Sequence, residues 1–393
     1  MKYLRIILNE PIILITLLSS IFFLLIILLI SKILLIKIGF LHSNRIGHFA
    51  ANTELYLIKK KKFGIKSLDL FYLGRKNISN NYLEKLWRKK IIILPYELLR
   101  GLDLIIRATP LKKKFSCNYF SNTDRDLYGL YEKFPPTITV DCKDKRDLLE
   151  KFNLTKNDKI VCINVRDSEY LKTLYDPKYH NLSYHDFRDC KIENFELAIN
   201  YLLKLNYKVF RVGVKKKTFL NISHQNYFDK TYSVNREDST DILLAENCNF
   251  CISVGSGFDA LPRIFRKPIL FVNFIPIINY HSFCKKDLTI CKHLYQKDKI
   301  SIENIFKKKL HGSLTEFYKN NNFQVIENTP EEILAATKEM VLRIENNFNL
   351  KAENLKYQNL IKNKIKEASH GNFLHGKLLA DFGEEYIKKN YYD

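Results

Sequence analysis

The first part of the chain is one continuous apolar segment. No charged residue occurs between Pro11 and Ser31, and nearly every position there is Ile, Leu or Phe. A helix of about 20 such residues matches the thickness of the hydrocarbon core of a bilayer. The segment is longer than the apolar part of a signal peptide, and no cleavage site of small residues follows it. The pattern therefore predicts one uncleaved transmembrane helix, with residues 1–32 as the membrane anchor.

Basic residues flank this segment on both sides. Lys2 and Arg5 precede it, offset in part by Glu10. A larger basic set follows it and comprises Lys32, Lys37, Arg45 and Lys59–Lys62. The more basic flank of a spanning helix stays on the cytoplasmic side. We therefore expect a single-pass protein whose main part faces the cytoplasm.

After the anchor, short apolar runs alternate with amphipathic stretches. Strands are predicted at 33–40, 68–73 and 91–94, and helices at 45–60, 81–89 and 96–107. Strands that alternate with helices form a parallel sheet covered by helices on both faces. Residues 33–150 are therefore predicted to form a first Rossmann-like lobe.

The same alternation is clearer in the second part of the chain. Strands are predicted at 159–165, 207–212, 250–254 and 269–274, and helices at 192–205, 238–246 and 257–266. The fold class is thus α/β, with a doubly wound sheet in residues 151–328. Thr329 and Pro330 form a strong helix start. We expect residues 329–393 to form helices that pack back across the lobes.

Composition and charge narrow the choice of partners. The chain of 393 residues contains 64 Lys and Arg against 42 Asp and Glu, which gives a net charge of +22. The basic residues are scattered, and no nucleic-acid-binding module is recognisable, so no nucleic-acid partner is predicted. Two interpretations of the charge stay open: a solvated lysine-rich surface, or attraction to anionic lipid headgroups and phosphorylated substrates.

The eight cysteines do not form a metal-binding pattern. Several lie in apolar runs, as Cys162 does, and are expected to be buried free thiols. Cys248 and Cys251 have the spacing of half a zinc site, but no second pair of Cys or His follows at a matching distance. We therefore predict no metal site and no cofactor.

The segment with the strongest ligand-binding character follows the strand at 250–254. Gly255-Ser256-Gly257 joins this strand directly to a helix. Small residues let a ligand approach the backbone, and a helix N-terminus offers free N–H groups to a phosphate. Arg166 and Arg211 end two strands of the same sheet and can neutralise a diphosphate. A plain tight turn is the alternative interpretation of the glycine segment.

An acidic segment, Asp238–Asp241, opens the helix before that strand. The carboxylate of Asp241 can accept a hydrogen bond from a ribose hydroxyl. A helix cap is the alternative interpretation of this segment.

In the first lobe, the run Arg45–Glu54 follows the first strand. Gly47 permits a close approach, and His48 lies in the first helical turn, where a histidine can act as general base on an acceptor hydroxyl. A capping or packing histidine is the alternative. Glu54 is a second candidate base or a surface charge.

Several ordered motifs together resemble a family of bacterial GT-B-type glycosyltransferases associated with surface-polysaccharide synthesis. They are Arg45–Leu57, Val165–Tyr170, Phe210–Gly213 and the Gly255–Gly257 segment, which is followed by Lys267-Pro268 and Val272-Asn273-Phe274. The Arg-Ile-Gly-His run is also similar to the Arg-Ile-Gly-Asp run of bacterial heptosyltransferases, whose acidic residue serves as base. His48 stands at that place here. The likeness covers most of the chain after the apolar segment.

The resemblance implies two Rossmann-like lobes of GT-B type. The second lobe would hold a nucleotide-sugar donor, and the first lobe would hold the acceptor beside Arg45, Gly47 and Asn52. The acceptor would be a glycan or a lipid-linked molecule at the bacterial inner membrane. No metal would be needed, because enzymes of the GT-B type usually work without one, and the nucleotide sugar would be a co-substrate rather than a cofactor.

The expected chemistry is glycosyl transfer in a cleft between the lobes, with His48 as base and with Arg166, Arg211 and the Ser256–Gly257 backbone stabilising the departing nucleoside diphosphate. Two other functions stay open. One is a transferase for polyol phosphates or other phosphate-linked groups of the cell envelope, and the other is a non-catalytic membrane scaffold.

Overall fold

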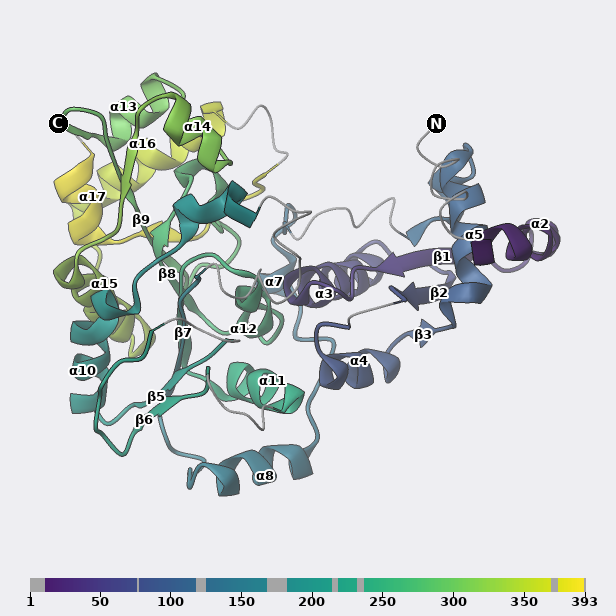
Figure 1. Cartoon of the computed structure of the whole chain (residues 1–393), viewed down its shortest axis with the longest axis horizontal. Helices are drawn as coiled ribbons and strands as arrows, with labels where there is room; N and C mark the ends of the chain where they lie inside the picture. Colours follow the sequence, from purple (N-terminus) through teal and green to yellow (C-terminus); the bar gives the residue numbers. More distant parts are fainter. Residues whose placement is uncertain are drawn as a thin grey trace. The chain divides into compact units, whose positions relative to one another are not determined.

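The computed structural model describes residues 11–75, 78–117, 125–167, 182–213, 218–231, 237–368 and 374–391, with only the backbone described for 11–18 and 182. The chain divides into two compact units (Figure 1). Unit 1 comprises Met1–Asp124 and Pro136–Val140, and unit 2 comprises Arg125–Pro135 and Asp141–Asp393. Each unit is described by itself.

The N-terminal apolar segment forms helix α2 (Pro11–Ile30). One side of α2 packs on α5 (Tyr96–Ala108), where Ile27 joins a core cluster with Leu99, Leu102 and Ile106. Among the described residues, no helix is both long and apolar enough to cross a membrane. The predicted transmembrane anchor is therefore not supported. Lys2 and Arg5, used to predict its orientation, lie outside the described residues.

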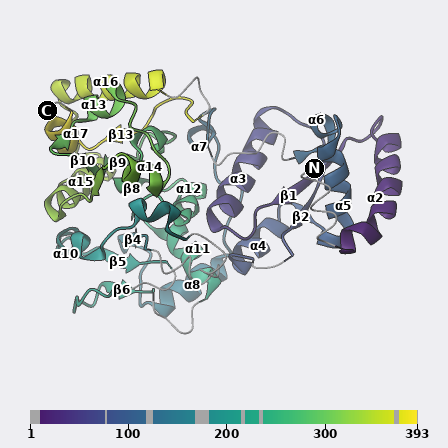
Figure 2. The ribbon, with the colours of Figure 1, turned by 45° about the horizontal axis from the view of Figure 1, so that its top comes forward.

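In the part of unit 1 that the structure describes, the sheet has three named strands, which are parallel. They are β1 (Ile36–Leu41), β2 (Leu68–Leu73) and β3 (Ile92–Ile93), in the order β1-β2-β3. Helices α3 (Ile46–Lys62) and α4 (Asn81–Arg88) lie on one side of this sheet, and α5 and α2 on the other (Figure 2). The lobe is thus α/β as predicted. Ile38 of β1 pairs with Leu70 of β2 on one edge and forms an isolated parallel bridge with Ser116 on the other. The chain therefore returns past β1 after β3, which is the reversal of strand order that a doubly wound sheet has.

The boundary between the units differs from the predicted break at residue 150. Helix α8 (Cys142–Lys151) belongs to unit 2, where Lys151 forms an ion pair of 2.9 Å with Glu237. Helix α7 (Leu130–Lys133) also belongs to unit 2, because Glu132 accepts a hydrogen bond of 3.0 Å from the Lys285 N–H. Only Pro136–Val140, between these helices, returns to unit 1.

Among its described residues, unit 2 contains a seven-stranded sheet in which each named pair of strands is parallel. Its strands are β4 (Ile160–Asn164), β5 (Lys208–Arg211), β6 (Tyr227–Asp229), β7 (Phe250–Ser253), β8 (Ile269–Phe274), β9 (Leu288–Cys291) and β13 (Asp381–Phe382). The strand order is β13-β9-β8-β7-β4-β5-β6. The order reverses at the β4–β7 pair, which is the hallmark of the doubly wound sheet that the sequence predicts.

Helices cover both faces of this sheet. Figure 1 shows α10 (Glu196–Lys204) and α15 (Pro330–Ile344) on one side, and α11 (Asp238–Asn247) and α12 (Ala260–Ile264) on the other. Strands β4, β7 and β8 are buried at every position. Such continuous apolar runs are typical of a central parallel strand.

The C-terminal part of the chain belongs entirely to unit 2. Helix α15 starts with the predicted cap: the Thr329 side chain accepts from the Glu332 N–H, and the Glu332 side chain accepts from the Thr329 N–H. The remaining elements are a small sheet of β10 (His293–Tyr295), β11 (Lys299–Ile300) and β12 (Gln324–Ile326), and the helices α13 (Ile302–Lys307), α14 (Thr315–Asn320), α16 (Ala352–Ala368) and α17 (Glu384–Asn390).

Candidate functional site

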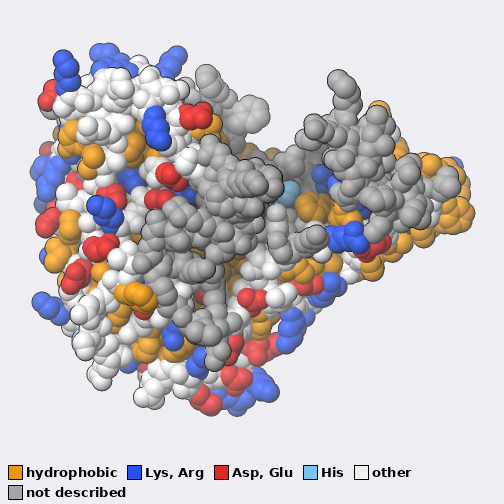
Figure 3. All heavy atoms as spheres, in the orientation of Figure 1, with side chains coloured by type: hydrophobic (Ala, Val, Ile, Leu, Met, Phe, Trp, Pro, Cys, Tyr) orange, Lys and Arg blue, Asp and Glu red, His pale blue; other side chains and the backbone are white. Residues whose placement is uncertain are grey.

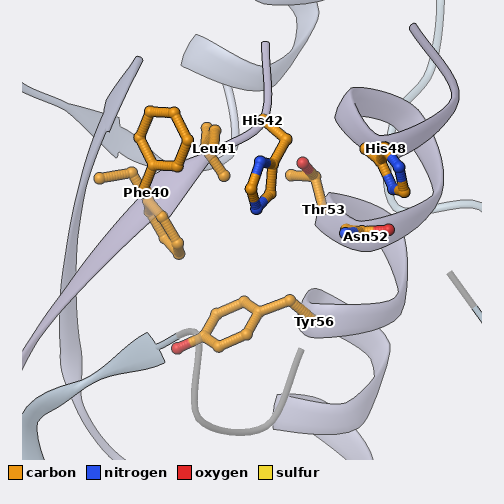
Figure 4. Close-up of a pocket in the computed structure, with 8 residues that line it drawn as sticks. Phe40, Leu41, His42, His48, Asn52, Thr53 and Tyr56 are labelled. Carbon is orange, nitrogen blue, oxygen red and sulfur yellow. The ribbon is translucent and has the colours of Figure 1, made fainter. Parts of the chain in front are cut away.

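Unit 1 contains a pocket where β1 ends and α3 begins (Figure 4). Apolar and aromatic side chains form most of its wall, and two histidines and an asparagine supply polar atoms. The lining residues are Phe40, Leu41, His42, His48, Asn52, Thr53, Tyr56 and Phe71. An apolar pocket with a few polar groups is the usual form of a small-molecule site.

Two polar atoms in this pocket are buried and lack a hydrogen-bond partner in the described part of the chain. They are His48 Nδ1 and Asn52 Oδ1. The two residues are four positions apart on α3, so both side chains lie on the same face of the helix. Buried polar atoms are nearly always paired. The structure therefore brings together the predicted base, His48, and one of the predicted acceptor-side residues, Asn52.

His42 also lines this pocket, although the sequence interpretation gave it no role. Its ring centroid lies 5.9 Å from that of His48 and 5.0 Å from that of Phe40. Burial, followed by the nearby His48, Arg107 and Arg45, lowers the pKa of His42. The lowered pKa favours the neutral form of His42, so His42 adds no positive charge beside His48. Its position directly after a predicted strand was the signal that could have identified it.

Arg45 and Gly47 flank this pocket along the chain but are not among its lining residues. Arg45 is the exposed N-cap residue of α3, with an extended backbone and no side-chain cap bond. Gly47 is the second residue of α3 and is half-buried. Their predicted acceptor-side roles stay predictions.

Glu54 has a different position from the one that a second catalytic base requires. It is completely buried and is not a lining residue of the pocket. Its Oε1 accepts from the Thr137 N–H at 3.1 Å, and its Oε2 accepts from the Thr137 hydroxyl. This contact fastens Pro136–Val140 to the rest of unit 1. The geometry corrects the catalytic interpretation of Glu54 to a structural one.

We expect the Glu54→Ala variant to lose about 1–3 kcal/mol of folding stability, because it leaves the Thr137 N–H and hydroxyl without their acceptor. Chemical denaturation monitored by circular dichroism measures this loss. Glu54→Gln keeps one acceptor and should retain most of the stability and all of the activity. A Glu54→Gln protein that is stable but inactive would restore the catalytic interpretation.

In unit 2, the predicted phosphate-binding segment lies at the point where the strand order reverses. Asn164 ends β4, and Gly255-Ser256 follows the neighbouring strand β7. The Ser256 hydroxyl donates to Asn164 Oδ1 at 2.7 Å and accepts from the Phe258 N–H at 3.2 Å. Ligands of doubly wound sheets bind beyond the carboxyl ends of the strands at this reversal.

Gly255 is required by the geometry of this turn. Its φ of +78° lies in the left-handed region, and a Cβ here would lie 2.9 Å from the Phe274 ring. Both features exclude a larger residue. The helix after Gly257 starts as a 3-10 turn (Gly257–Asp259) before the short α12. The dipole of so short a helix is weak, so the positive charge that binds a phosphate must come from side chains.

Three cationic side chains supply such charge near the carboxyl ends of β4, β7 and β9. Arg166 pairs with the Asp189 carboxylate, and Lys292 donates to the Asp189 carbonyl at 2.6 Å. Arg188 donates to the Gly255 carbonyl, and burial, followed by the charge of Arg166, lowers its pKa. Arg188 and Lys292 were not predicted as site residues. The end of the predicted motif, 168–170, lies outside the described residues.

Arg211 does not occupy the predicted phosphate-binding position. Its side chain is buried, and its Nη1 donates to Asp229 Oδ2 at 2.9 Å and to the Thr218 carbonyl at 2.6 Å. Asp229 is its register partner on the neighbouring strand β6. Since a buried arginine paired in this way holds two strands together, we assign Arg211 a structural role.

Asp241 is buried in the first turn of α11. This position neither confirms nor contradicts the predicted contact with a ribose. Within the described residues, no group of three or more His, Cys, Asp or Glu side chains is arranged to hold a metal ion.

Comparison with known proteins gives only distant similarities. No family model matches the chain, and no curated protein sequence matches it. The chain is similar to a family 9 glycosyl transferase from Veillonella parvula (12% identity, 78% of this chain and 97% of that chain, TM-score 0.45). It is also similar to the ADP-heptose heptosyltransferase II of E. coli (13% identity, 79% and 99%, TM-score 0.41).

A third similar structure is a dodecameric iron-containing glycosyltransferase from enterotoxigenic E. coli (10% identity, 79% of this chain and 76% of that chain, TM-score 0.37). TM-scores below 0.5 do not establish a common fold. We therefore base the functional proposal on sheet topology and side-chain contacts within each unit.

Proposed function

We propose that this chain is a glycosyltransferase that moves a sugar from a nucleotide-sugar donor to an acceptor hydroxyl. The observation that carries the proposal is the reversal point between β4 and β7. There the Ser256–Asn164 hydrogen bond, the tight turn at Gly255 and the side chains of Arg166 and Arg188 lie together. Small residues and arginines at such a point suit a nucleoside diphosphate.

In this proposal, unit 2 holds the donor. Arg166 and Arg188 neutralise the negative charge that develops on the diphosphate as the glycosidic bond breaks, and Asp241 accepts from a ribose hydroxyl. Fixed charges aimed at a leaving group commonly supply the largest part of catalysis. Arg211 is left out of this set, because its side chain is buried between two strands, where it pairs with its register partner Asp229.

Unit 1 holds the acceptor in the pocket beside His48 and Asn52. The free Nδ1 of His48 removes the proton from an acceptor hydroxyl, and that oxygen attacks the anomeric carbon of the sugar. The bond from this carbon to the diphosphate oxygen breaks, and the nucleoside diphosphate leaves with the bonding electrons. Asn52 Oδ1 orients the acceptor by accepting from a second hydroxyl.

The proposed place of this reaction rests on the resemblance in the sequence and on the basic residues that flank the N-terminal apolar segment. We propose that the acceptor is a glycan or a lipid-linked molecule of bacterial surface-polysaccharide synthesis. The enzyme would then act at the cytoplasmic side of the inner membrane.

The proposal is tested by incubating the purified chain with a panel of nucleotide sugars. A bound donor should raise the melting temperature by mass action. With an acceptor present, a nucleoside diphosphate should be released. Release of a nucleoside monophosphate instead would indicate transfer of a phosphate-linked group. If no nucleotide sugar stabilises the chain, the glycosyltransferase proposal is wrong.

Donor binding is expected to weaken as pH rises through about 6. Burial, opposed by Arg166, raises the pKa of Asp189 to about 6. Below this pH Asp189 is neutral and releases Arg166 to the diphosphate. Above it, the carboxylate retains Arg166 as its own partner. We expect a change in Kd on the order of tenfold, equivalent to one pKa unit of coupling.

Calorimetric titration with a nucleotide sugar at several pH values measures this effect. The matched control is Asp189→Asn, which should bind the donor tightly at every pH because Arg166 is always released. An unchanged pH profile in that variant would show that Asp189 does not compete with the donor.

A further inference from the structure

Glycosyl transfer does not explain the outward side of α2. Ile27 faces α5, whereas Phe22, Leu25 and Leu29 are 62%, 55% and 74% exposed. These three lie three and four positions apart, so they form one stripe along the helix. Ile33, 94% exposed, continues the stripe beyond the helix end. Figure 3 shows hydrophobic side chains gathered there.

No polar side chain interrupts this stripe. Residues 21–30 are all Ile, Leu or Phe, whereas the helix of a water-soluble protein carries polar residues on its outward side. Patches of neighbouring exposed apolar side chains mark interaction sites on soluble proteins. The stripe therefore requires an apolar partner.

Lysines cluster at the C-terminal end of this stripe. Lys32 follows α2, and Lys112–Lys114 form the start of α6 (Lys112–Phe115). All four are exposed. Lys114 Nζ lies 3.4 Å from the Ser31 hydroxyl, which places this run beside the end of α2. An apolar helix face next to clustered lysines matches the chemistry of an anionic bilayer surface.

We infer that the stripe Phe22, Leu25, Leu29 and Ile33 inserts into the headgroup region of an anionic lipid bilayer, while Lys32 and Lys112–Lys114 bind the headgroups. The other side of α2 stays packed on α5. A protein partner fits the charge less well, because lysine is depleted from protein interfaces. A second copy of the chain would bring two lysine runs onto one contact, and like charges oppose this.

The test is flotation of the full-length chain with vesicles of phosphatidylcholine, either alone or mixed with phosphatidylglycerol. The wild type should float with the mixed vesicles and much less with the neutral ones. The triple variant F22S/L25S/L29S should partition into the vesicles at least about 10³-fold more weakly, because three large apolar side chains no longer enter the lipid. The triple variant K112Q/K113Q/K114Q should lose binding to mixed vesicles by on the order of 100-fold.

A matched control replaces three exposed apolar residues of unit 2, Phe219, Leu314 and Leu355, with serine. They are 60%, 46% and 50% exposed, so the loss of surface hydrophobicity is comparable. This variant should float like the wild type. Two results would overturn the inference: flotation of the stripe variant equal to wild type, or a lipid-free dimer that the stripe variant makes monomeric.

The inference does not rest on glycosyl transfer, and the two can fail separately. Donor binding by the stripe variant, measured as a rise in melting temperature, reports unit 2 alone. If the stripe variant no longer floats but still binds a donor, the result supports both the membrane inference and the glycosyltransferase proposal. A wild type that floats but binds no donor removes only the catalytic one.

Discussion

The His48→Ala variant is expected to lose glycosyl transfer by a factor of about 10²–10⁴, the usual contribution of a general base. His48 Nδ1 is buried in the unit 1 pocket and has no partner among the described residues. In the tautomer that carries its proton on Nε2, the Nδ1 lone pair can accept the proton of an acceptor hydroxyl. Alanine removes this acceptor without disturbing a hydrogen bond in the described structure. The loss should appear in kcat, measured as nucleoside diphosphate released per enzyme with donor and acceptor saturating.

The donor provides an internal control for this experiment. Because the proposed donor site is in unit 2, the Kd for the nucleotide sugar should stay unchanged in His48→Ala. His224→Ala, at an exposed histidine of unit 2, serves as the matched variant and should keep wild-type turnover. Asn52→Ala should instead raise KM for the acceptor, since Asn52 orients but does not deprotonate it. Wild-type turnover in His48→Ala would reject His48 as the base.

The sequence predicts central strands well, because a strand that is buried on both faces is a continuous run of apolar residues. Strands β4, β7 and β8 are unbroken apolar runs and were predicted within one or two residues. Strands β6, β9 and β13 were not predicted. Strands β6 and β13 lie at the two edges of the sheet and comprise only three and two residues. Strand β9 is buried at all four positions, but Thr289 interrupts its apolar run.

In unit 1, the sequence identified those site residues whose orientation depends only on the periodicity of helix α3. His48 and Asn52 are four residues apart on α3 and share the pocket face. Glu54 is six residues from His48, which is about 240° around a helix, so it lies on a different face. Its partner Thr137 is 83 residues away along the chain, and no local pattern indicates that contact.

In unit 2, local sequence identified the turn but not the partners of the charged residues. Gly255-Ser256-Gly257 was located from its place after a buried strand. The partner of Arg211 depends on the register of β5 with β6, which places Asp229 opposite it. Arg188 reaches Gly255 from a segment 67 residues earlier in the chain. The partner of a charged side chain thus depends on contacts between residues far apart in the chain, and the local sequence pattern does not predict these contacts.

The largest stability effect is expected at a buried ion pair that supports this turn. Arg263, on α12 directly after the glycine segment, lies 2.5 Å from the Asp287 carboxylate. Both side chains are almost fully buried, and Asp287 also accepts from the Ile269 N–H at 2.9 Å, where β8 begins. The Arg263 guanidinium lies about 6 Å from the centres of the Phe271 and Phe283 rings.

Asp287→Ala should therefore lower the free energy of unfolding by about 3–5 kcal/mol, because it leaves the Arg263 charge buried without a counterion. Chemical denaturation monitored by circular dichroism measures the loss. The decisive control is the double variant R263M/D287N. It removes both charges, retains an oxygen for the Ile269 N–H and should recover most of the lost stability. If the double variant were as unstable as Asp287→Ala, the loss would come from packing rather than from an uncompensated charge.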